Sequence, residues 1–339
     1  MLAGVTGLLA ARLLSATETL AQENPFAGRT IEFLSGYDES SIANPPLRQL
    51  VLSMERILDA RIVYRTNPGG TTESTAALLA SAPPDGLTIG TADIDSLLAK
   101  ALGRVDLDIT EFRILGCLDL DLDTLFANAE SGITSITDLL TRDPPANLPV
   151  RATTSGGYMY GLLINAVLGT RIRPVTGYGS SERDLAFLTN EGQIAFVNLD
   201  EAERLVADGA GLPLLKTADV TIPPAAGNPP ALSEFPANPR YAWVVDYLNS
   251  AIYSNIIAAP KGVPETHLEV LRAAFLQACT DPAMIAVSQP LIILDPRGGE
   301  EIEDAIADML AKLDSFSESL QDALTCGQKL AETGEACGA

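Results

Sequence analysis

The chain has 339 residues, of which 47% are hydrophobic and 19% are charged. That composition excludes a disordered chain, and the length allows two domains of ordinary size. Its 44 acidic residues outnumber its 22 basic residues and give a net charge of −22, a surface that repels nucleic acid and anionic lipid. We therefore expect a soluble protein of two domains with no nucleic-acid partner.

The first residues have the features of a secretory leader. An apolar stretch runs from Leu2 to Leu14, and small residues lie near position 21. This pattern is typical of a signal peptide that is cleaved after Ala21, so we assign residues 1–21 to the leader and predict export. No Lys or Arg precedes the apolar stretch and Arg12 interrupts it, so an ordinary first helix is the alternative.

Strand and helix patterns then alternate along the chain. A strand is predicted at residues 31–34, a helix at 47–58, a second strand at 62–64, another helix after the turn at 67–72, and a third strand at 87–90. This βαβαβ order favours an α/β fold with a parallel sheet and right-handed crossovers.

A second series begins in the middle of the chain. Its predicted strands lie at 150–153 and 193–197, its helices at 160–168 and 201–208, and a Pro- and Asn-rich loop at 223–239. A last strand follows at 255–259, Pro264 begins a helix, and one final helix carries an apolar stripe of Ile302, Ile306, Met309, Leu313, Phe316 and Leu320.

These two series predict two lobes with a cleft between them, each lobe a mostly parallel sheet flanked by helices. We assign residues 26–125 and 255–325 to the first lobe, 126–254 to the second and 326–339 to a C-terminal tail. Ligands of open α/β sheets lie beyond the carboxyl ends of the strands, so the loops at those ends are the candidate site.

Three of these loops are rich in Gly, Ser and Thr, and each precedes a helix. They cover residues 35–41, 67–72 and 153–158. Free N–H groups and partial positive charge at a helix N-terminus bind a carboxylate or phosphate without a cationic side chain. The same residues are also ordinary caps and turns. None of the loops has a nucleotide-binding spacing, and we expect no cofactor.

The order of these motifs resembles that of the solute receptors of tripartite tricarboxylate transporters, the Bug proteins. The segments that carry the resemblance are Pro68-Gly69-Gly70-Thr71-Thr72, Pro84-Asp85-Gly86-Leu87-Thr88, Ser155-Gly156-Gly157-Tyr158, Tyr178-Gly179-Ser180 and Ala259-Pro260-Lys261-Gly262-Val263-Pro264. A further counterpart is Gly36-Tyr37 with Ser40-Ser41. The resemblance covers residues 26–320.

The resemblance implies a monomeric periplasmic receptor that closes on a small organic anion, expected to be a carboxylate, and delivers it to the membrane permease subunits of a transporter. The ligand-binding residues expected on this basis are Tyr37, Ser40, Ser41, Gly70, Thr71 and Thr72 in one lobe and Thr154, Ser155, Gly156, Gly157 and Tyr178 in the other. A binding protein that serves a sensor instead of a permease is the first alternative.

The sequence also departs from the family pattern near the first loop. Asp38 and Glu39 add two acidic residues there, Ser40 and Ser41 stand where the family has glycines, and Asn44 stands where it usually has Asp. The two acids would repel a dicarboxylate, or favour a ligand that is neutral or carries an amine. The charge preference of the site therefore stays open at this point.

The remaining chemistry offers weak alternatives to binding. A hydrolase is the less favoured alternative, because the single histidine, His267, lies on a predicted helix with no candidate nucleophile beside it. Acidic residues alternate with Leu over residues 118–123, which overlaps a calcium-loop spacing, but Thr124 occupies its glycine position and a half-buried strand has the same alternation. We expect no metal site and no enzymatic activity.

The cysteines leave their own question open. Four cysteines, at positions 117, 279, 326 and 337, allow three disulfide connectivities. Cys326 and Cys337 could close a small loop, whereas Cys117 and Cys279 lie in apolar segments, where a buried free thiol is the alternative to a disulfide.

Overall fold

The computed structural model describes residues 24–37, 39, 41–66, 72–106, 108–120, 123–289 and 291–335, and of residues 72, 73, 199, 200 and 293 it describes the backbone only. The predicted leader, residues 1–21, lies outside these ranges. The chain forms two compact units. Of the described residues, those within 24–94, 108–120 and 253–306 form the first unit, and those within 95–106, 123–252 and 307–335 form the second. The segments 95–106 and 307–325 thus belong to the second unit, whereas the sequence assigned them to the first lobe.

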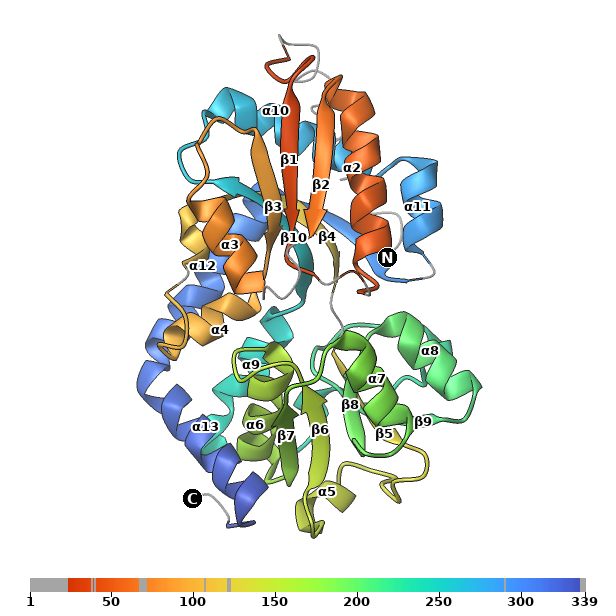
Figure 1. The fold of residues 1–339 in the computed structure, drawn as a ribbon. Coiled ribbons are helices and arrows are strands. Elements are labelled where there is room, and N and C mark those ends of the chain that lie inside the picture. Colours follow the sequence, from red (N-terminus) through yellow and green to blue (C-terminus); the bar gives the residue numbers. More distant parts are fainter. Residues whose placement is uncertain are drawn as a thin grey trace. The chain divides into compact units, whose positions relative to one another are not determined.

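The first unit is built on a six-stranded sheet with the order β11-β4-β10-β3-β1-β2 (Figure 1). Its strands are β1 (Thr30–Ser35), β2 (Arg61–Thr66), β3 (Thr88–Ala92), β4 (Phe112–Leu120), β10 (Tyr253–Pro260) and β11 (Ile293–Gly298). Its helices are α2 (Asn44–Leu58), α3 (Thr72–Ala80), the 3-10 turn η1 (Ile109–Glu111), α10 (Glu265–Ala278), α11 (Pro282–Ser288) and the first half of α12 (Gly299–Ser315).

The predicted βαβαβ order is confirmed, but the sheet is mixed. β1 pairs in parallel with both β2 and β3, as helical crossovers require. β10 is antiparallel to β3 and β4, and β11 is antiparallel to β4. The expectation of a mostly parallel sheet is wrong here, because β4 and β10 are joined to segments of the second unit and not to helical crossovers within the first.

One face of this sheet carries the main hydrophobic core of the unit. Leu47, Leu50, Met54 and Leu58 of α2 recur at helical spacing, and all four side chains are fully buried. They pack in one cluster with residues of β1, α10 and α11. Figure 1 shows α2 and α11 beside each other at this face.

The second unit contains two small sheets. β5 (Thr124–Asn128) is antiparallel to both β8 (Ile194–Val197) and β9 (Gly211–Lys216), and β6 (Ala146–Val150) is parallel to β7 (Ile172–Thr176). Only the β6–β7 pair, which is joined by a helical crossover, is parallel as expected. The predicted strand at 150–153 begins earlier and ends at Val150, because residues 151–155 form the loop before the next helix.

The helices of the second unit are α4 (Asp95–Ala101), α5 (Asp138–Thr141), α6 (Gly156–Leu168), α7 (Ser180–Leu188), α8 (Leu199–Ala207), α9 (Trp243–Ser250) and α13 (Ser317–Glu332). The segment 223–239 holds the short 3-10 turns η2 (Pro224–Ala226) and η3 (Leu232–Glu234) and leads into η4 (Pro239–Tyr241). α13 lies along α6 (Figure 1).

The C-terminal region differs from the sequence expectation in two ways. The predicted single helix is two helices, α12 and α13, with a break at Phe316, whose ring stacks on Trp243 with 5.0 Å between centroids. The expected tail from residue 326 is helical as far as Glu332, because its apolar residues Leu330 and Ala331 are buried on the α6 side of the unit.

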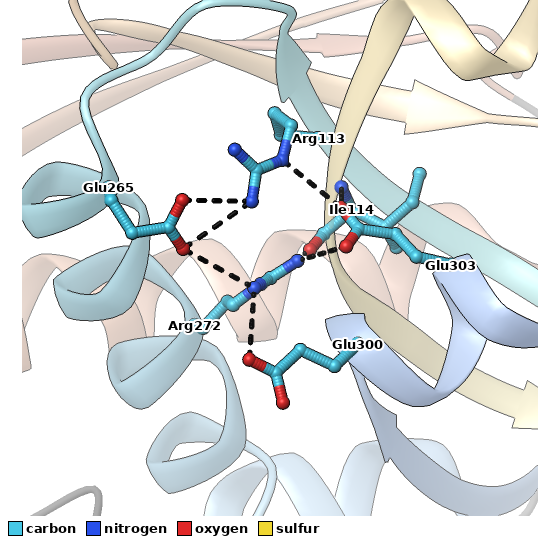
Figure 2. A network of polar contacts seen from close by, with 6 residues as sticks. All are labelled: Arg113, Ile114, Glu265, Arg272, Glu300 and Glu303. Atoms are coloured by element: carbon cyan, nitrogen blue, oxygen red, sulfur yellow. Dashed lines mark hydrogen bonds and ion pairs between the residues drawn. The ribbon is translucent and has the colours of Figure 1, made fainter.

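A network of charged side chains holds the start of α12 in the first unit (Figure 2). Arg272 of α10 donates from Nε to the Ile114 carbonyl at 2.8 Å and forms an ion pair with Glu303 at 2.8 Å. Glu303 in turn accepts the Ile114 N–H at 3.0 Å. Arg113 reaches Glu265 at 3.0 Å and Glu303 at 3.4 Å, so α10, β4 and α12 are joined by one set of contacts.

Within the described residues, no single helix is both long and apolar enough to cross a membrane. The helices α10 and α11, which meet at an angle of 67°, reach that length and apolar composition only when they are taken together.

Two cysteines are buried in the first unit as free thiols, Cys117 in β4 and Cys279 at the end of α10. Cys326 is disulfide-bonded, and Cys337 lies outside the described residues. Burial raises the pKa of both free thiols well above the ordinary value. Since the thiolate is the reactive form, both groups are protected by their position and by their protonation.

We expect iodoacetamide to leave Cys117 and Cys279 unmodified in the folded protein and to alkylate both once the chain is unfolded in guanidinium. Peptide mass spectrometry after a short labelling pulse measures this directly. Alkylation of either cysteine at the same rate with and without guanidinium would contradict the burial of that thiol.

Candidate functional site

In the first unit, polar residues gather at the carboxyl ends of β1, β2 and β3. The buried Asn44, at the start of α2, accepts a hydrogen bond from the Tyr64 hydroxyl at 2.6 Å and one from Ser35 Oγ at 3.4 Å. The N–H of Gly36 donates to Thr91 Oγ1 at 2.9 Å. Ser35 and Thr91 are fully buried, so this network fixes the loop that follows β1.

The acidic residue Glu39 in this loop is paired. Its carboxylate lies 2.9 Å from Nη2 of Arg48 and accepts the Thr66 hydroxyl at 2.7 Å. The hydrogen bond from Thr66, with the nearby Arg48, holds the pKa of Glu39 below its usual range. Arg48 also lies over the Tyr64 ring at 4.3 Å. Because Arg48 compensates the charge, Glu39 repels an approaching anion less than the sequence suggests.

The residues predicted for ligand binding in this unit are only partly described. Ser41 accepts hydrogen bonds from the N–H groups of Ala43 and Asn44, and it therefore shapes the turn before α2. Tyr37 donates its N–H to Ser35 Oγ at 3.4 Å and packs against the core. α3 begins at Thr72. Ser40, Gly70 and Thr71 lie outside the described residues, as does Asp38.

In the second unit, Thr154, Ser155, Gly156 and Gly157 form the turn at which α6 begins. Ser155 is the N-cap residue, but its hydroxyl donates to the Ala152 carbonyl at 2.7 Å and caps no helical N–H. The N–H of Gly156 donates to the Asp95 carboxylate at 2.9 Å. The N–H of Gly157 has no acceptor among the residues that the structure describes. Of the first two amides of α6, the Gly156 N–H is therefore used within the unit, and the Gly157 N–H is not paired with any of the described residues.

Asp95 is a residue that sequence reasoning missed. Besides the Gly156 N–H, it accepts the hydroxyl of the buried Tyr160 at 2.6 Å. Burial, reinforced by Asp95, raises the pKa of Tyr160 well above its ordinary value, so the phenol stays neutral and donates. A Cβ atom on Gly156 would lie 2.2 Å from the Asp95 carboxylate, so this contact requires glycine. No spacing in the sequence links residue 95 to residue 156.

The same segment, residues 95–106, supplies a cation to this loop. The guanidinium of Arg104 hydrogen-bonds to the Thr153 carbonyl and lies 5.5 Å from the centre of the Tyr158 ring. The Tyr158 hydroxyl reaches Gln328 of α13 at 3.4 Å. The loop is thus held on one side by a carboxylate and on the other by a guanidinium.

Tyr178 lies beside this loop but its hydroxyl is already engaged. Its N–H donates to the Val150 carbonyl at 3.3 Å, and the neighbouring Gly177 donates to the Arg151 carbonyl at 3.1 Å. The Tyr178 hydroxyl donates to Glu191 at 2.7 Å, a hydrogen bond that raises the pKa of the phenol. The backbone of Tyr178 is therefore joined to the carboxyl end of β6, where the loop that leads to α6 begins.

The residues considered for other chemistry are in structural roles. His267 is half-buried, lies 3.0 Å through Nδ1 from the Asp85 carbonyl, and meets the Phe26 ring edge to face at 5.4 Å. It joins α10 to the turn before β3. Among the residues that the structure describes, no group of three His, Cys, Asp or Glu side chains is arranged to hold a metal ion.

The chain matches no protein-family model and no curated protein. It is similar in structure to a TctC solute-binding protein from Polaromonas, with 16% identity, a TM-score of 0.65, and 87% of this chain and 98% of that chain covered. MatC from Rhodopseudomonas palustris, solved with malate, is 17% identical with a TM-score of 0.67 over 87% and 99% of the two chains. A second R. palustris protein, solved with adipate, is 16% identical with a TM-score of 0.66 over 88% and 97%. The chain therefore has the α/β fold of these solute-binding proteins, as its motifs predict.

Proposed function

We propose that this protein is a periplasmic receptor that captures a small carboxylate and delivers it to the permease of a tripartite tricarboxylate-type transporter. The observation that carries the proposal is the Gly157 N–H at the start of α6, a backbone donor at the carboxyl end of β6, in a fold that holds malate or adipate in two solved relatives. A helix N-terminus stabilises a carboxylate without a lysine or arginine.

The proposed ligand-binding residues are Tyr37, Ser40, Ser41, Gly70, Thr71 and Thr72 of the first unit and Thr154, Ser155, Gly156, Gly157 and Tyr178 of the second. Within the second set, Gly156 holds Asp95 and thereby positions the turn, while the Gly157 N–H is offered to the ligand. Tyr178 contributes its ring, since its hydroxyl is bound to Glu191. Arg104 adds positive charge beside the turn.

Binding is tested by thermal unfolding of the purified chain with a panel of monocarboxylates, dicarboxylates, amino acids and neutral sugars. We expect a carboxylate to raise the melting temperature in a concentration-dependent way without being consumed. Gly157→Asn places a side chain between Val150 and Phe196 at the turn, so it should weaken that carboxylate at least about tenfold, or 1.4 kcal/mol.

The matched control is Gly209→Asn. Gly209 follows α8 in the left-handed region, has open space around it, and asparagine tolerates that conformation, so binding should be unchanged. If no carboxylate shifts the melting temperature, or if both variants bind as the wild type does, the proposed function is wrong.

Location and delivery need separate measurements. We propose that the mature chain begins after Ala21 and acts as a monomer. N-terminal sequencing of protein from an osmotic-shock fraction checks the first point, and sedimentation checks the second. A transport receptor and a sensor differ in their effect on uptake. If the protein is a transport receptor, a strain that lacks it should lose carboxylate uptake, and the wild type but not Gly157→Asn should restore that uptake.

A further inference from the structure

Two side chains of the first unit hold a carboxylate at the carboxyl end of β2. Arg48 of α2 donates from Nη2 to one oxygen of the Glu39 carboxylate at 2.9 Å, and the Thr66 hydroxyl donates to the other oxygen at 2.7 Å. Thr66 is the last residue of β2 and directly precedes the turn at residues 67–72, which the sequence predicts to bind ligand. This carboxylate therefore lies at the edge where α/β sheets bind their ligands.

The guanidinium of Arg48 is held in place by an aromatic ring. It lies over the Tyr64 ring at 4.3 Å, and that ring stacks on Phe33 of β1 with 5.2 Å between centroids. The Tyr64 hydroxyl donates to the buried Asn44 at 2.6 Å, one helical turn before Arg48. Both donors to the carboxylate thus come from regular elements, α2 and β2, whereas Glu39 comes from the loop between β1 and α2.

The Glu39 carboxylate is bound weakly enough to be exchanged. Its side chain is 66% exposed and that of Arg48 is 45% exposed, and exposed ion pairs contribute little free energy. Only Nη2 of Arg48 is hydrogen-bonded to it, and the other guanidinium nitrogens have no acceptor among the residues that the structure describes. A carboxylate from solution can form two parallel hydrogen bonds with a guanidinium, which is the stronger geometry. Such a carboxylate can therefore compete with Glu39 for Arg48.

We infer that Arg48 and Thr66 bind a carboxylate group of the ligand, and that Glu39 is a built-in competitor which this group displaces. The inference rests on the proposed function and adds to it a cationic residue outside the Gly-, Ser- and Thr-rich loops. Because Glu39 must be released first, the apparent affinity is lower than Arg48 alone would give. A neutral solute cannot replace the negative charge of Glu39 beside Arg48, so the exchange selects anions over neutral solutes of similar shape.

Glu39→Gln tests the competition. The probe is the carboxylate that raises the melting temperature most, chosen from a panel that includes malate and adipate. Isothermal titration at physiological salt should show binding to this variant that is tighter by about fivefold, because an amide holds a guanidinium less strongly than a carboxylate does. The gain should be clearly smaller in an Arg48→Met background, where there is no guanidinium to release. No gain, or an equal or larger gain without Arg48, would mean that Glu39 only repels the ligand and would overturn the inference.

Arg48→Met tests the site itself. It keeps an apolar stem over Tyr64 and should weaken the same carboxylate by about tenfold, the loss expected for a charge-assisted hydrogen bond. The matched control is Arg56→Met, which removes the same charge from the same helix where the guanidinium is bound to Asp281, and it should change the affinity less than about twofold. Equal effects of the two variants would overturn the inference and leave the proposed function standing. If no carboxylate of the panel binds the wild type, both are wrong.

Discussion

Replacing Arg272 by alanine is expected to lower the free energy of unfolding by about 2 kcal/mol, because its largely buried guanidinium is hydrogen-bonded to the Ile114 carbonyl and compensates the partly exposed Glu303 carboxylate. The Arg272 side chain is only 11% exposed, and it compensates Glu303 at 2.8 Å while binding the Ile114 carbonyl. Glu265 and Glu300 lie 3.9 and 3.6 Å from the same guanidinium. Urea unfolding followed by far-UV circular dichroism measures the change.

The control for this variant is Arg65→Ala in the same unit. Arg65 is 65% exposed and forms an ion pair with Glu32 at 2.5 Å, and exposed pairs of this kind contribute less than about 1 kcal/mol. If the two variants lose the same stability, burial does not set the strength of the network in Figure 2. Arg272→Lys keeps the positive charge but cannot bind the Ile114 carbonyl and the Glu303 carboxylate at the same time with the planar geometry of a guanidinium. Its loss in the free energy of unfolding should lie between those of Arg272→Ala and Arg65→Ala.

Replacing Gly327 by alanine is expected to have the second large effect on the free energy of unfolding, and the sign of that change shows how closely α13 packs against α6. In an open helix position this substitution stabilises by about 1 kcal/mol through helix propensity. Here a Cβ atom on Gly327 would lie 2.0 Å from the Leu162 carbonyl oxygen of α6. The helices must separate, so we expect a net loss of about 3 kcal/mol in the free energy of unfolding, as for overpacked cores.

The backbone contact at Gly327 is tied to a fully buried asparagine, which adds to that loss. Asn165 Nδ2 donates to the Gly327 carbonyl at 3.1 Å, and this bond lengthens if α13 moves outward, whereas its bond to the Ile172 carbonyl at 2.8 Å joins α6 to β7. Thr325→Ala, at an exposed position of the same helix, should change the free energy of unfolding by less than about 0.5 kcal/mol. A stabilised Gly327→Ala protein would show that α13 does not approach α6 so closely.

The sequence predicts the elements of this fold better than it predicts their pairing. Hydrophobic periodicity placed β1 and α2, because each of these two elements buries one regular face, while β2 and β3 were recognisable as short apolar segments. The direction of β10 was not predictable, since it depends on a connection through the other unit. The alternation at residues 118–123 suggested a strand with one polar face, yet Asp119 is 4% exposed and accepts a hydrogen bond from Asn255, which is distant in sequence.

The candidate site was predictable only as far as local backbone chemistry defines it. Glycine and hydroxyl residues before a helix identify the turn at 154–157, because the requirement for an unhindered helix N-terminus is local. Asp95, Arg104 and the pairing of Glu39 with Arg48 depend on tertiary contacts that no spacing encodes.

The position of β10 has a consequence for biosynthesis. This strand lies between β3 and β4, although its residues, 253–260, leave the ribosome after most of the chain. A nascent chain that has not yet reached residue 253 has an unpaired edge on β3 and no link from that edge to β4. The sheet of the first unit can therefore be completed only late in synthesis, and until then the paired strands of this unit leave an open edge at β3.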